Sequence, residues 1–520
     1  MTPTRTHTST PHTSRTHSLR AITAGIVGVS ADLEVSDVTL DSRAASPGSL
    51  FLACRGKTHH GIRFAPQAVS QGAKAVLYDP ADLRAEELPP FRSDIFVAPV
   101  FDLGRHVGTI AERFFGGPAQ ALTVVGITGT NGKTTCAWLL AQALQNCGRS
   151  AAYVGTIGYG IPPARTATNH TTSDAVSVHR QLAELRTAGA ECVSMEVTSH
   201  AIDQDRVTAV RFETAVLTNL TRDHLDYHGT MEAYGATKAR LFAWPSLSHR
   251  VINIDDSFGA QLATQAQPSR LVVTGRSARA SQVPGAHFVR AVHAEPVASG
   301  LRLAIESSWG NSTVTVPLIG DFNIDNVLTV LGVLLAWGIE LSLALQAVSR
   351  SKAPPGRMEV FGGTQQAPAV IVDYAHTPDA LDKALRAARA HCQGKLRVVF
   401  GCGGDRDTGK RPVMGRIAAE LADDVIVTDD NPRTEDPAKI VRDIVTGFDG
   451  AVGQASGARV AQVEHDRAKA ISAAIQRSAR DDVVVIAGKG HEDYQIYGTE
   501  RRSFSDQAIV EPELARRVRA

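Results

Sequence analysis

The chain has 520 residues, which is enough for about three domains, and 43% of its residues are hydrophobic, so several cores can be buried. The formal net charge of +1 excludes both a global basic field for nucleic acid and an acidic solvating tail. No apolar run reaches the ~20 residues of a membrane span, and the N-terminus has no apolar signal core. We expect a large soluble protein with no nucleic-acid partner and no membrane span.

Residues 1–19 are mostly Thr, Ser, His, Arg and Pro and contain no acidic residue. This composition cannot bury a core, so we expect a disordered extension, or a start codon placed too early, in preference to a transit peptide. The six cysteines show no C-x-x-C spacing, which argues against a zinc ribbon and a disulfide framework. A reducing cytoplasm is the compartment that fits.

Residues 20–101 predict a small mixed α/β domain. Strand-like segments at 31–40 and 49–56 precede a predicted helix and a further apolar strand at 73–80. The polar segment 41–43 is typical of a loop.

Residues 102–352 predict the central domain, which begins with a helical segment at 102–115. Within it, the apolar run 122–127 is typical of a buried parallel strand, the polar Gly-rich turn 128–132 follows, and an amphipathic helix begins at Lys133. Backbone N–H groups in such a turn, together with the positive end of the helix dipole, form a site for phosphate oxygens.

Two side chains of this segment have defined roles in a nucleotide site. Lys133 would neutralise phosphate charge, and the hydroxyl of Thr134 would hold Mg²⁺. The strict phosphate-loop pattern is not met, because Ile127 stands where that pattern has Gly. A plain turn is the alternative, and the position of the Gly-Lys-Thr triplet between a strand and a helix favours the nucleotide site.

The rest of the central domain predicts a mostly parallel sheet. Apolar strands at 192–197, 214–220 and 250–255 alternate with helix-length segments. Shorter strands between about 270 and 318 predict an antiparallel addition, and the segment 322–338 predicts a long helix.

Two prolines at 354–355 mark the boundary of a third domain, residues 353–520. Its apolar strands, which end in polar or glycine residues, are at 368–375, 396–404, 423–431 and 481–490. Ligands of open α/β sheets gather at the carboxyl ends of strands, which here carry Asp373, Asp405, Asp430 and Lys489. The predicted fold class is α/β, with a small mixed N-terminal domain, a central P-loop parallel-sheet ATPase domain and a Rossmann-like C-terminal domain.

Three residues of the central domain have the chemistry of a metal site. Glu196 follows a strand and would lie at the sheet edge that carries the phosphate loop, where a carboxylate can ligate nucleotide-bound Mg²⁺. His224 lies just past the next strand, and Lys238 follows fourteen residues later. A histidine with a carboxylate can take a second divalent ion. Taken singly, the alternatives are a solvated strand-end glutamate, a hydrogen-bonded loop histidine and a solvated helix lysine.

Three motifs occur in order: GTNGKT at Gly129–Thr134, EVTSH at Glu196–His200 and DHLDYH at Asp223–His228. With these motifs the chain resembles the Mur ligase family from about Leu40 to its end, in particular the type that adds 2,6-diaminopimelate in peptidoglycan assembly. Folylpolyglutamate synthase, of the same superfamily, shares the phosphate loop and the lysine. Alternatives from other classes are a P-loop switch or kinase, although no N-K-x-D guanine motif occurs, and a non-catalytic nucleotide-binding scaffold, which would not explain the metal ligands.

The resemblance implies an ATP site with two Mg²⁺ ions. Thr134 and Glu196 would hold the first ion, and Glu196, His224 and Lys238 would hold or surround the second, with Lys238 carbamylated by CO2 so that it no longer repels a metal. The implied catalytic residues are Lys133, Glu196, His224 and Lys238. The implied ATP-binding residues are Gly129, Thr130, Asn131, Gly132, Lys133, Thr134, Thr135, Asn323, Asn326, Arg357, Asp373 and His376.

The resemblance also implies a site for UDP-MurNAc-L-Ala-D-Glu. Its residues would be Leu40, Ser42, Lys57, Thr58 and His59 at the uridine diphosphate, and Thr171, Thr172, Thr198, Gln204 and Arg206 at the muramoyl end. The chain departs from the family pattern where Ser173 replaces a proline and Thr198 replaces a serine. Both motifs keep a hydroxyl where it matters, and the loss of proline makes the turn less rigid.

For the amino-acid substrate, the resemblance points to the motif DNPR at Asp430–Arg433. Arg433 could pair bidentately with the carboxylate that meso-diaminopimelate has and lysine lacks, and it would repel a lysine side chain. A surface Asn-Pro turn is the alternative. The implied pocket, positive for one carboxylate and negative for the distal ammonium, comprises Arg406, Asp430, Asn431, Pro432, Arg433, Gly488 and Glu492.

The implied activity is that of an ATP-dependent, ADP-forming amide ligase. ATP would phosphorylate the D-glutamate carboxylate, and the amine of meso-diaminopimelate would attack the acyl phosphate to give UDP-MurNAc-tripeptide. Activation is needed because a carboxylate is a poor electrophile at neutral pH. We expect one domain for each reactant, closure that excludes water from the acyl phosphate, a monomeric chain and a cytoplasmic location.

Overall fold

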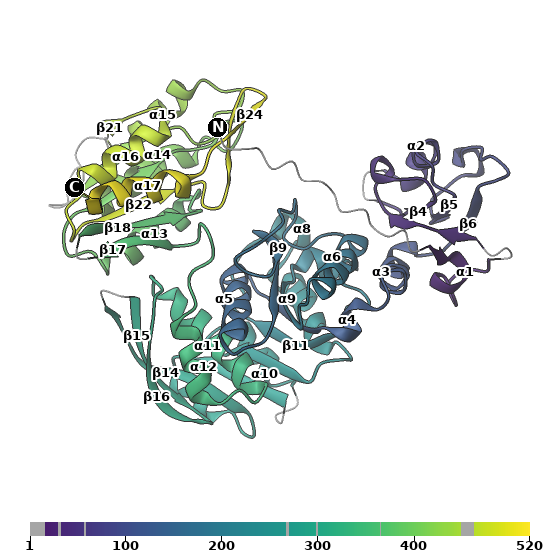
Figure 1. The fold of residues 1–520 in the computed structure, drawn as a ribbon, viewed down its shortest axis with the longest axis horizontal. Helices are drawn as coiled ribbons and strands as arrows, with labels where there is room; N and C mark the ends of the chain where they lie inside the picture. The colour runs from purple at the N-terminus through teal and green to yellow at the C-terminus, as the bar shows by residue number, and fades with distance from the viewer. Residues whose placement is uncertain are drawn as a thin grey trace.

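The computed structural model describes residues 16–29, 33–56, 59–266, 270–297, 300–364, 366–448 and 462–519. These residues form three α/β domains, each built on its own main sheet, and Figure 1 shows the central domain between the other two. The predicted fold class, α/β in three domains, is confirmed.

The small domain is built on a four-stranded parallel sheet in the order β3-β4-β5-β6, and β4 is buried along its whole length. A strand that is covered on both faces needs the continuous apolar run that the sequence has here. The elements are β1 (His17–Ser18), α1 (Leu19–Ile22), β2 (Glu34–Val35), β3 (Asp37–Thr39), β4 (Ser49–Ala53), α2 (Ala65–Ser70), β5 (Ala75–Tyr78) and β6 (Phe96–Pro99).

The structure differs from two predictions for the N-terminal region. The single strand predicted at 31–40 contains two short strands, β2 and β3. Of the predicted extension 1–19, residues 1–15 lie outside the described residues, whereas β1 pairs with β2 and Leu19 is fully buried. Leu19 is apolar, and its burial anchors this end of the chain to the small domain.

Helix α3 (Leu103–Phe114) joins the small domain to the central domain. Its residues Val107, Ile110 and Phe114 belong to the same buried cluster as Leu50 of the small sheet. The same buried cluster contains Ala175 and Val176 of α6 (Ala175–Thr187) in the central domain. Helix α3, which the sequence assigned to the central domain, therefore packs against both domains.

The central domain has a ten-stranded sheet in the order β16-β15-β14-β13-β12-β11-β7-β10-β8-β9. Strand β7 lies between β10 and β11 and is parallel to both, so the carboxyl ends of these three strands share one edge. The elements are α4 (Pro118–Ala121), β7 (Thr123–Thr128), α5 (Lys133–Asn146), β8 (Ala151–Gly155), β9 (Gly158–Gly160), α6 (Ala175–Thr187), β10 (Cys192–Glu196), α7 (Ser199–Asp203), β11 (Phe212–Leu217), α8 (Leu225–His228), α9 (Met231–Ala239), β12 (His249–Asn253), α10 (Ser257–Ala263), β13 (Leu271–Gly275), β14 (His287–Val297), β15 (Gly300–Ser307), β16 (Gly310–Val316), α11 (Phe322–Ala336) and α12 (Leu341–Ser349).

The predicted antiparallel addition is confirmed for β14, β15 and β16 and wrong for β13. Strand β13 is parallel to both of its neighbours, β12 and β14. Helix α10 connects β12 to β13, and a helical crossover of this kind returns the chain in the same direction.

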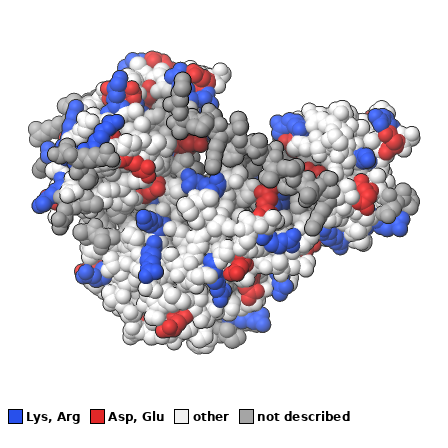
Figure 2. All heavy atoms as spheres, viewed as in Figure 1, with Lys and Arg blue, Asp and Glu red and all other residues white. Residues whose placement is uncertain are grey.

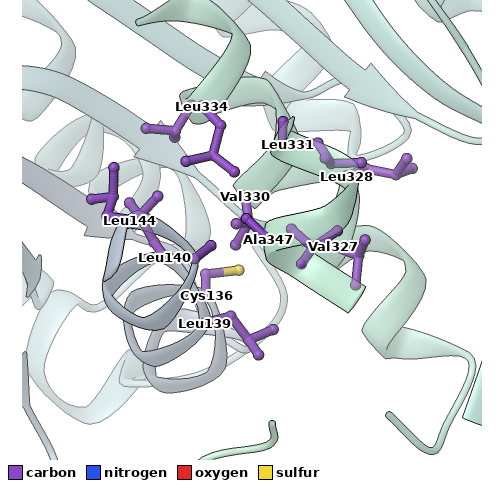
Figure 3. Packing of buried hydrophobic residues seen from close by; sticks show 14 of the residues in the cluster. Cys136, Leu139, Leu140, Leu144, Val327, Leu328, Val330, Leu331, Leu334 and Ala347 are labelled. Carbon is purple, nitrogen blue, oxygen red and sulfur yellow. The ribbon is translucent and has the colours of Figure 1, made fainter. Parts of the chain in front are cut away.

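Helix α5, which begins directly after the predicted phosphate loop, is buried on both sides. One side packs against the sheet, and on the other side Leu140 and Leu144 lie toward Val330 and Leu334 of α11 (Figure 3). The residues predicted to form the apolar face include Leu140 and Leu144, which meet α11, but Trp138 and Leu139 on other sides of the helix are buried as well, so the helix is apolar on more than the predicted face. This packing fixes the N-terminus of α5 relative to the sheet edge.

The C-terminal domain has a six-stranded sheet in the order β17-β18-β22-β19-β20-β21. The four strands predicted from the sequence are β18, β22, β19 and β20, and they are parallel neighbours. Their carboxyl ends therefore share one edge. The elements are β17 (Glu359–Thr364), β18 (Ala367–Asp373), α13 (Pro378–Arg389), β19 (Leu396–Phe400), α14 (Lys410–Leu421), β20 (Asp424–Val427), α15 (Pro437–Val445), β21 (Gln462–Val463), α16 (Arg467–Gln476), β22 (Val483–Ala487), β23 (Tyr494–Tyr497), β24 (Glu500–Ser503) and α17 (Asp506–Arg519).

The surface carries both signs of charge. On the face in Figure 2, Lys and Arg are interspersed with Asp and Glu, and uncharged areas lie between them, in keeping with the net charge of +1. Among the described residues, no helix has both the length and the apolar character that crossing a membrane requires. All six cysteines are free thiols.

Candidate active site

The loop after β7 has the backbone of a phosphate-binding loop. Gly129 and Gly132 have φ of +147° and +85°, in the region that favours glycine. A Cβ would lie 1.9 Å from Thr218 Oγ1 at the first position and 2.6 Å from Asn326 Oδ1 at the second. Only glycine fits this loop, which leads into the N-terminus of α5, where backbone N–H groups favour an anion.

The end of the neighbouring strand β11 holds the loop in place. Thr218 Oγ1 donates to the Asn131 carbonyl at 2.6 Å, and the Thr130 N–H donates to the Asn219 carbonyl at 2.9 Å. The Asn131 N–H donates to Asn219 Oδ1 at 2.9 Å. The loop is therefore fixed to a rigid sheet edge before any ligand binds.

Lys133 folds back over its own loop. Its Nζ donates to the carbonyls of Gly129 and Thr130, each at 2.9 Å. Burial lowers the pKa of this ammonium, and the Glu196 carboxylate acts in the opposite direction. The positive charge lies at the loop where phosphate oxygens would approach.

Glu196, at the end of β10, is fully buried and hydrogen-bonded on both carboxylate oxygens. Thr134 Oγ1 donates to Oε2 at 2.9 Å, while Tyr153 OH and the Thr156 N–H donate to Oε1 at 2.5 and 2.9 Å. Burial and the Glu196 charge raise the pKa of Tyr153 well above its usual value, so the phenol stays a donor. The predicted pair of Thr134 and Glu196 is therefore brought together next to the phosphate loop.

Lys238, on α9, has a side chain that is almost enclosed, with 1% exposure. Its Nζ donates to the Gly129 carbonyl at 2.9 Å, the same oxygen that Lys133 contacts, and lies 3.4 Å from Thr128 Oγ1. Burial, followed by the charge of Lys133, holds the pKa of Lys238 well below its usual value. The ammonium at this position therefore loses its proton more readily than that of an exposed lysine.

His224 is exposed at the edge of the site, with a φ of +54°. Its Nε2 lies 3.5 Å from Asp223 Oδ2, and its ring centroid is 4.9 Å from that of His200. Both histidines line the same cavity as Glu196.

Most of the predicted phosphate-loop, metal and muramoyl residues meet in one cavity of about 470 Å³, whereas Gly129, Lys238 and Gln204 are not part of its lining. Its lining residues are Thr130, Asn131, Gly132, Lys133, Thr134, Thr135, Thr156, His170, Thr171, Thr172, Glu196, Thr198, His200, Arg206, His224 and Arg357. Arg357 is the contribution of the C-terminal domain, so the cavity lies where two domains meet.

Asn323 and Asn326 do not reach this cavity wall but lie behind the phosphate loop. Asn326 Nδ2 donates to Asn323 Oδ1 at 2.8 Å, and Asn323 Nδ2 donates to the Ile319 carbonyl at 2.7 Å. Both side chains are buried. Here they brace the loop, since Asn326 Oδ1 packs against Gly132.

The C-terminal residues predicted near the nucleotide form a cluster around Tyr374. The Arg357 guanidinium lies over the Tyr374 ring, 4.8 Å from its centroid. Asp373 accepts the N–H of Met358 and of Ala375, and burial raises the pKa of this carboxyl. His376 is exposed. The structure places Arg357 on the cavity, while Asp373 supports the backbone beside it.

The residues predicted for the first substrate line three adjoining cavities. Leu40 and Ser42 line a cavity of about 930 Å³ in the small domain, where Ser42 Oγ donates to Gln67 Oε1 at 2.7 Å. Leu40 also lines a cavity of about 870 Å³ with Gln204 and Arg206. Since Arg206 lines the 470 Å³ cavity as well, the three adjoin one another.

The threonines predicted at the muramoyl end lie close to Glu196. Thr172 Oγ1 donates to the Glu196 carbonyl at 2.8 Å, and Thr198 Oγ1 caps α7 by accepting the Ala201 N–H. Thr171 Oγ1 lies 3.0 Å from Thr156 Oγ1.

The predicted loop at the uridine diphosphate end is described only in part. Lys57 and Thr58 lie outside the described residues. His59 is exposed, and its carbonyl accepts the Gly56 N–H at 3.1 Å.

The residues predicted for the amino acid lie at the shared strand edge of the C-terminal domain. Asp430 and Asn431 are buried, and Asn431 Nδ2 donates to Glu492 Oε2 at 3.0 Å. Arg433 donates to the Gly404 carbonyl at 2.8 Å. A Cβ on Gly403 would come within 2.9 Å of the Arg433 guanidinium and 3.7 Å of Arg406 Cγ, so these two arginines flank the same glycine. Pro432 and Gly488 lie beside Asn431 and Lys489 in the two loops.

Several residues of the site were not predicted from the sequence. Tyr153 and Thr156 bond Glu196, His170 and His200 line the cavity, and Thr218 fixes the phosphate loop. His200 was within the quoted EVTSH motif, and Thr156 follows a strand at the same sheet edge, which was the available signal. Nothing in the sequence pairs Tyr153 with Glu196, because that contact depends on β8 lying next to β10.

Three family models match the chain. They are described as "Mur ligase family, catalytic domain" at residues 34–114, "Mur ligase middle domain" at 127–334, and "Mur ligase, glutamate ligase domain" at 356–490. The first match ends with α3, in agreement with the packing of that helix on the small sheet.

Curated relatives are similar over almost the whole chain. The UDP-N-acetylmuramoyl-L-alanyl-D-glutamate–2,6-diaminopimelate ligase of Ectopseudomonas mendocina is 47% identical over 92% of this chain and 95% of that protein. The ligase of the same name from Pseudomonas aeruginosa is 46% identical over 93% of this chain and 96% of that protein.

Solved structures of ligases of this kind are also similar to the chain. A UDP-N-acetylmuramoyl-L-alanyl-D-glutamate–2,6-diaminopimelate ligase has a TM-score of 0.68 and 34% identity, and the match covers 96% of this chain and 99% of that one. A Mycobacterium tuberculosis folylpolyglutamate synthase, complexed with ADP and AMPPCP, has a TM-score of 0.54 with 17% identity, covering 74% and 92% of the two chains. At that identity the second match shows a shared fold alone.

Proposed function

The chain belongs to the Mur ligase family, and from this premise we propose that it joins meso-2,6-diaminopimelate to UDP-MurNAc-L-Ala-D-Glu with hydrolysis of ATP to ADP and phosphate. One observation carries the proposal. The phosphate loop, Glu196 and the threonines at the muramoyl end all line a single cavity that Arg357 closes from the C-terminal domain.

The reaction is a phosphoryl transfer followed by an acyl transfer. An oxygen of the D-glutamate carboxylate attacks the γ-phosphorus, and the bond to the ADP oxygen breaks. The substrate amine then attacks the acyl carbon, phosphate leaves, and the nitrogen loses a proton. Lys133, Arg357 and the loop N–H groups position the phosphates and neutralise charge, which is the main protein contribution in phosphoryl transfer.

The residues next to the loop fit a magnesium ion. Thr134 Oγ1 and a Glu196 carboxylate oxygen lie 2.9 Å apart, and such hard oxygen donors, completed by nucleotide phosphates, are the ligands that Mg²⁺ prefers. Among the described residues, no group of three or more His, Cys, Asp or Glu side chains is arranged as a closed metal site, so the nucleotide must supply ligands. When bound, Mg²⁺ would neutralise the phosphate charge.

A second ion fits only if Lys238 is modified. An ammonium repels a cation, whereas a carbamate offers oxygens, and the burial that lowers the pKa of Lys238 favours loss of the proton that must precede addition of CO2. His224, on the same cavity as Glu196, would complete the surroundings of this ion. We therefore propose two Mg²⁺ ions and a carbamylated Lys238.

The amino-acid pocket has the charges that meso-diaminopimelate requires. Arg433 and Arg406 flank Gly403 and would bind the distal carboxylate, while Glu492 would receive the distal ammonium. L-Lysine lacks that carboxylate, so its ammonium would face two arginines without compensation.

The experiment that tests the phosphate-loop role is ADP formation by the variant Lys133→Ala. We expect a loss of about 100-fold or more, because a preorganised charge at the transferring phosphate is removed. Lys383→Ala, which removes an exposed lysine of α13, is the matched control and should keep wild-type turnover. Retained turnover in a folded Lys133→Ala protein would contradict the proposed role of the loop.

A further inference from the structure

Lys489 is a buried cation that the reaction described above does not use. It follows β22, and its side chain has no exposed surface. Its Nζ lies 3.3 Å from Asp430 Oδ1, 3.3 Å from Asn431 Oδ1 and 3.2 Å from Glu492 Oε2. An ammonium has three N–H donors, and three acceptors surround this one.

These acceptors all belong to the predicted amino-acid pocket and are tied to one another. Asn431 Nδ2 donates to Glu492 Oε2 at 3.0 Å, and Asn431 Oδ1 accepts the Ile496 N–H at 3.0 Å. The loops after β20 and β22 thus form one hydrogen-bonded network with the Lys489 ammonium at its centre.

The electrostatics of the network require a cation at this point. Asp430 is 6% exposed, and its carboxylate and that of Glu492 contact the same nitrogen atom. Two carboxylates held this close in a buried site repel each other unless a positive charge lies between them. Without that charge, the two loops would separate or reorganise.

We propose that Lys489 is a positioning residue for the amino-acid substrate, which holds the Glu492 and Asp430 carboxylates in the arrangement that receives the distal ammonium group. The proposal rests on the proposed function, since the ammonium is that of the amino acid that the enzyme links. Lys489 does not touch the substrate, because its side chain is enclosed, and it acts through its partners.

A purely structural ion pair is the alternative, and the same domain contains one for comparison. Arg397, on β19, is 9% exposed and pairs with Asp482. This pair lies where β19 and β22 begin, at the sheet edge opposite to the pocket. Arg397→Met therefore removes a buried cation from the same sheet without touching the pocket.

The test is the KM of each of the three substrates for Lys489→Met and Lys489→Gln. We expect the KM for meso-diaminopimelate to rise by about tenfold or more in Lys489→Met, with a smaller change in kcat and unchanged KM values for ATP and UDP-MurNAc-L-Ala-D-Glu. Lys489→Gln keeps two N–H donors without the charge and should show a smaller rise. Arg397→Met should lower thermal stability and leave all three KM values unchanged.

Each other outcome contradicts the proposal. Unchanged KM values, or an equal rise of all three, would assign Lys489 to general structure. Loss of folding in both Lys489 variants while Arg397→Met folds would do the same. A wild-type enzyme that links no meso-diaminopimelate would contradict the proposed function instead, so the two failures are distinguishable.

Discussion

Two lysine side chains near the phosphate loop donate hydrogen bonds to the same carbonyl oxygen. Lys133 and Lys238 both donate to Gly129, each at 2.9 Å, and two ammonium groups on one acceptor repel each other. Burial lowers the pKa of both ammonium groups, and the charge of Lys133 lowers the pKa of Lys238 further. The two lysines therefore influence each other's charge at one loop position.

We expect amino-acid specificity to depend most on Arg433. Arg433→Ala should raise the KM for meso-diaminopimelate by about 10- to 100-fold, because a charge-assisted bidentate contact is worth about 1.5–3 kcal/mol and each 1.4 kcal/mol is about tenfold. The measurement is the KM from phosphate release at saturating ATP. Arg502→Ala, at an exposed arginine of β24, is the control. Unchanged KM in Arg433→Ala would place carboxylate recognition elsewhere.

His491 gives the C-terminal domain a defined pH dependence. Burial, followed by the nearby Arg357 and Arg165, lowers the pKa of His491 from 6.5 to about 4. As the pH falls, His491 is therefore protonated in the unfolded chain before it is protonated in the folded protein. The contribution of neutral His491 to the free energy of unfolding is complete above pH 6.5 and is lost as the pH falls toward 4. This loss amounts to about 3 kcal/mol.

The comparison of wild type with His491→Gln isolates that contribution. Between pH 7 and pH 4, the free energy of unfolding in urea should fall by about 3 kcal/mol more for the wild type than for the variant, since the variant has no imidazole to protonate. Parallel stability curves would show that His491 titrates normally in the folded protein.

At the element scale, the C-terminal pocket depends on a helix that lies behind it. Arg411, on α14, has no exposed surface and donates to the Gly403 carbonyl and to both carboxylate oxygens of Glu435. Glu435 also accepts the Asp405 N–H. Arg411 therefore joins the loop after β19, which carries Arg406, to the loop after β20, which carries Arg433.

Arg411→Met should lower the free energy of unfolding by about 3 kcal/mol, because the partner carboxylates lose a buried cation while keeping some contact with solvent. Urea unfolding followed by circular dichroism measures this. Arg416→Met is the matched control on the same helix. Arg416 is exposed and lies 3.9 Å from Glu420. Its substitution should lower the free energy of unfolding by less than about 0.5 kcal/mol. Equal effects of the two variants would mean that Arg411 does not link the loops.

The sequence was informative where local pattern and chemistry coincide. The strand, loop and helix around Lys133 were predicted because glycine, a lysine and an apolar run are adjacent in the chain. Neighbours from distant segments were not predictable: β13 was assigned the wrong direction, and Tyr153 was assigned no role. These depend on which strands and helices meet, and periodicity alone does not determine that.

The burial of α5 was predicted only in part for the same reason. The face with Leu140 and Leu144 was predicted to be apolar, but the sequence did not show that α11, nearly two hundred residues later in the chain, covers that face, or that Trp138 and Leu139 are buried as well. The roles implied by resemblance also needed the structure to separate them: Glu196 faces the cavity, whereas Asn323 and Asn326 brace the loop from behind.

At the scale of the whole molecule, each domain contributes a wall to a continuous line of cavities. Leu40 lines both the cavity of about 930 Å³ and the cavity of about 870 Å³. Arg206 lines the second of these and the cavity at the phosphate loop, to which the C-terminal domain contributes Arg357. A substrate with a nucleotide at one end and a carboxylate at the other can span this line.

The central claim is that this chain activates a carboxylate with ATP and delivers it to a dicarboxylic diamine. The most direct measurement is phosphate release by the purified protein with ATP, Mg²⁺ and UDP-MurNAc-L-Ala-D-Glu, with meso-diaminopimelate or L-lysine as the acceptor. We expect rapid release and a tripeptide product with meso-diaminopimelate and little turnover with L-lysine. Preferential use of L-lysine, or no consumption of ATP with either amine, would contradict it.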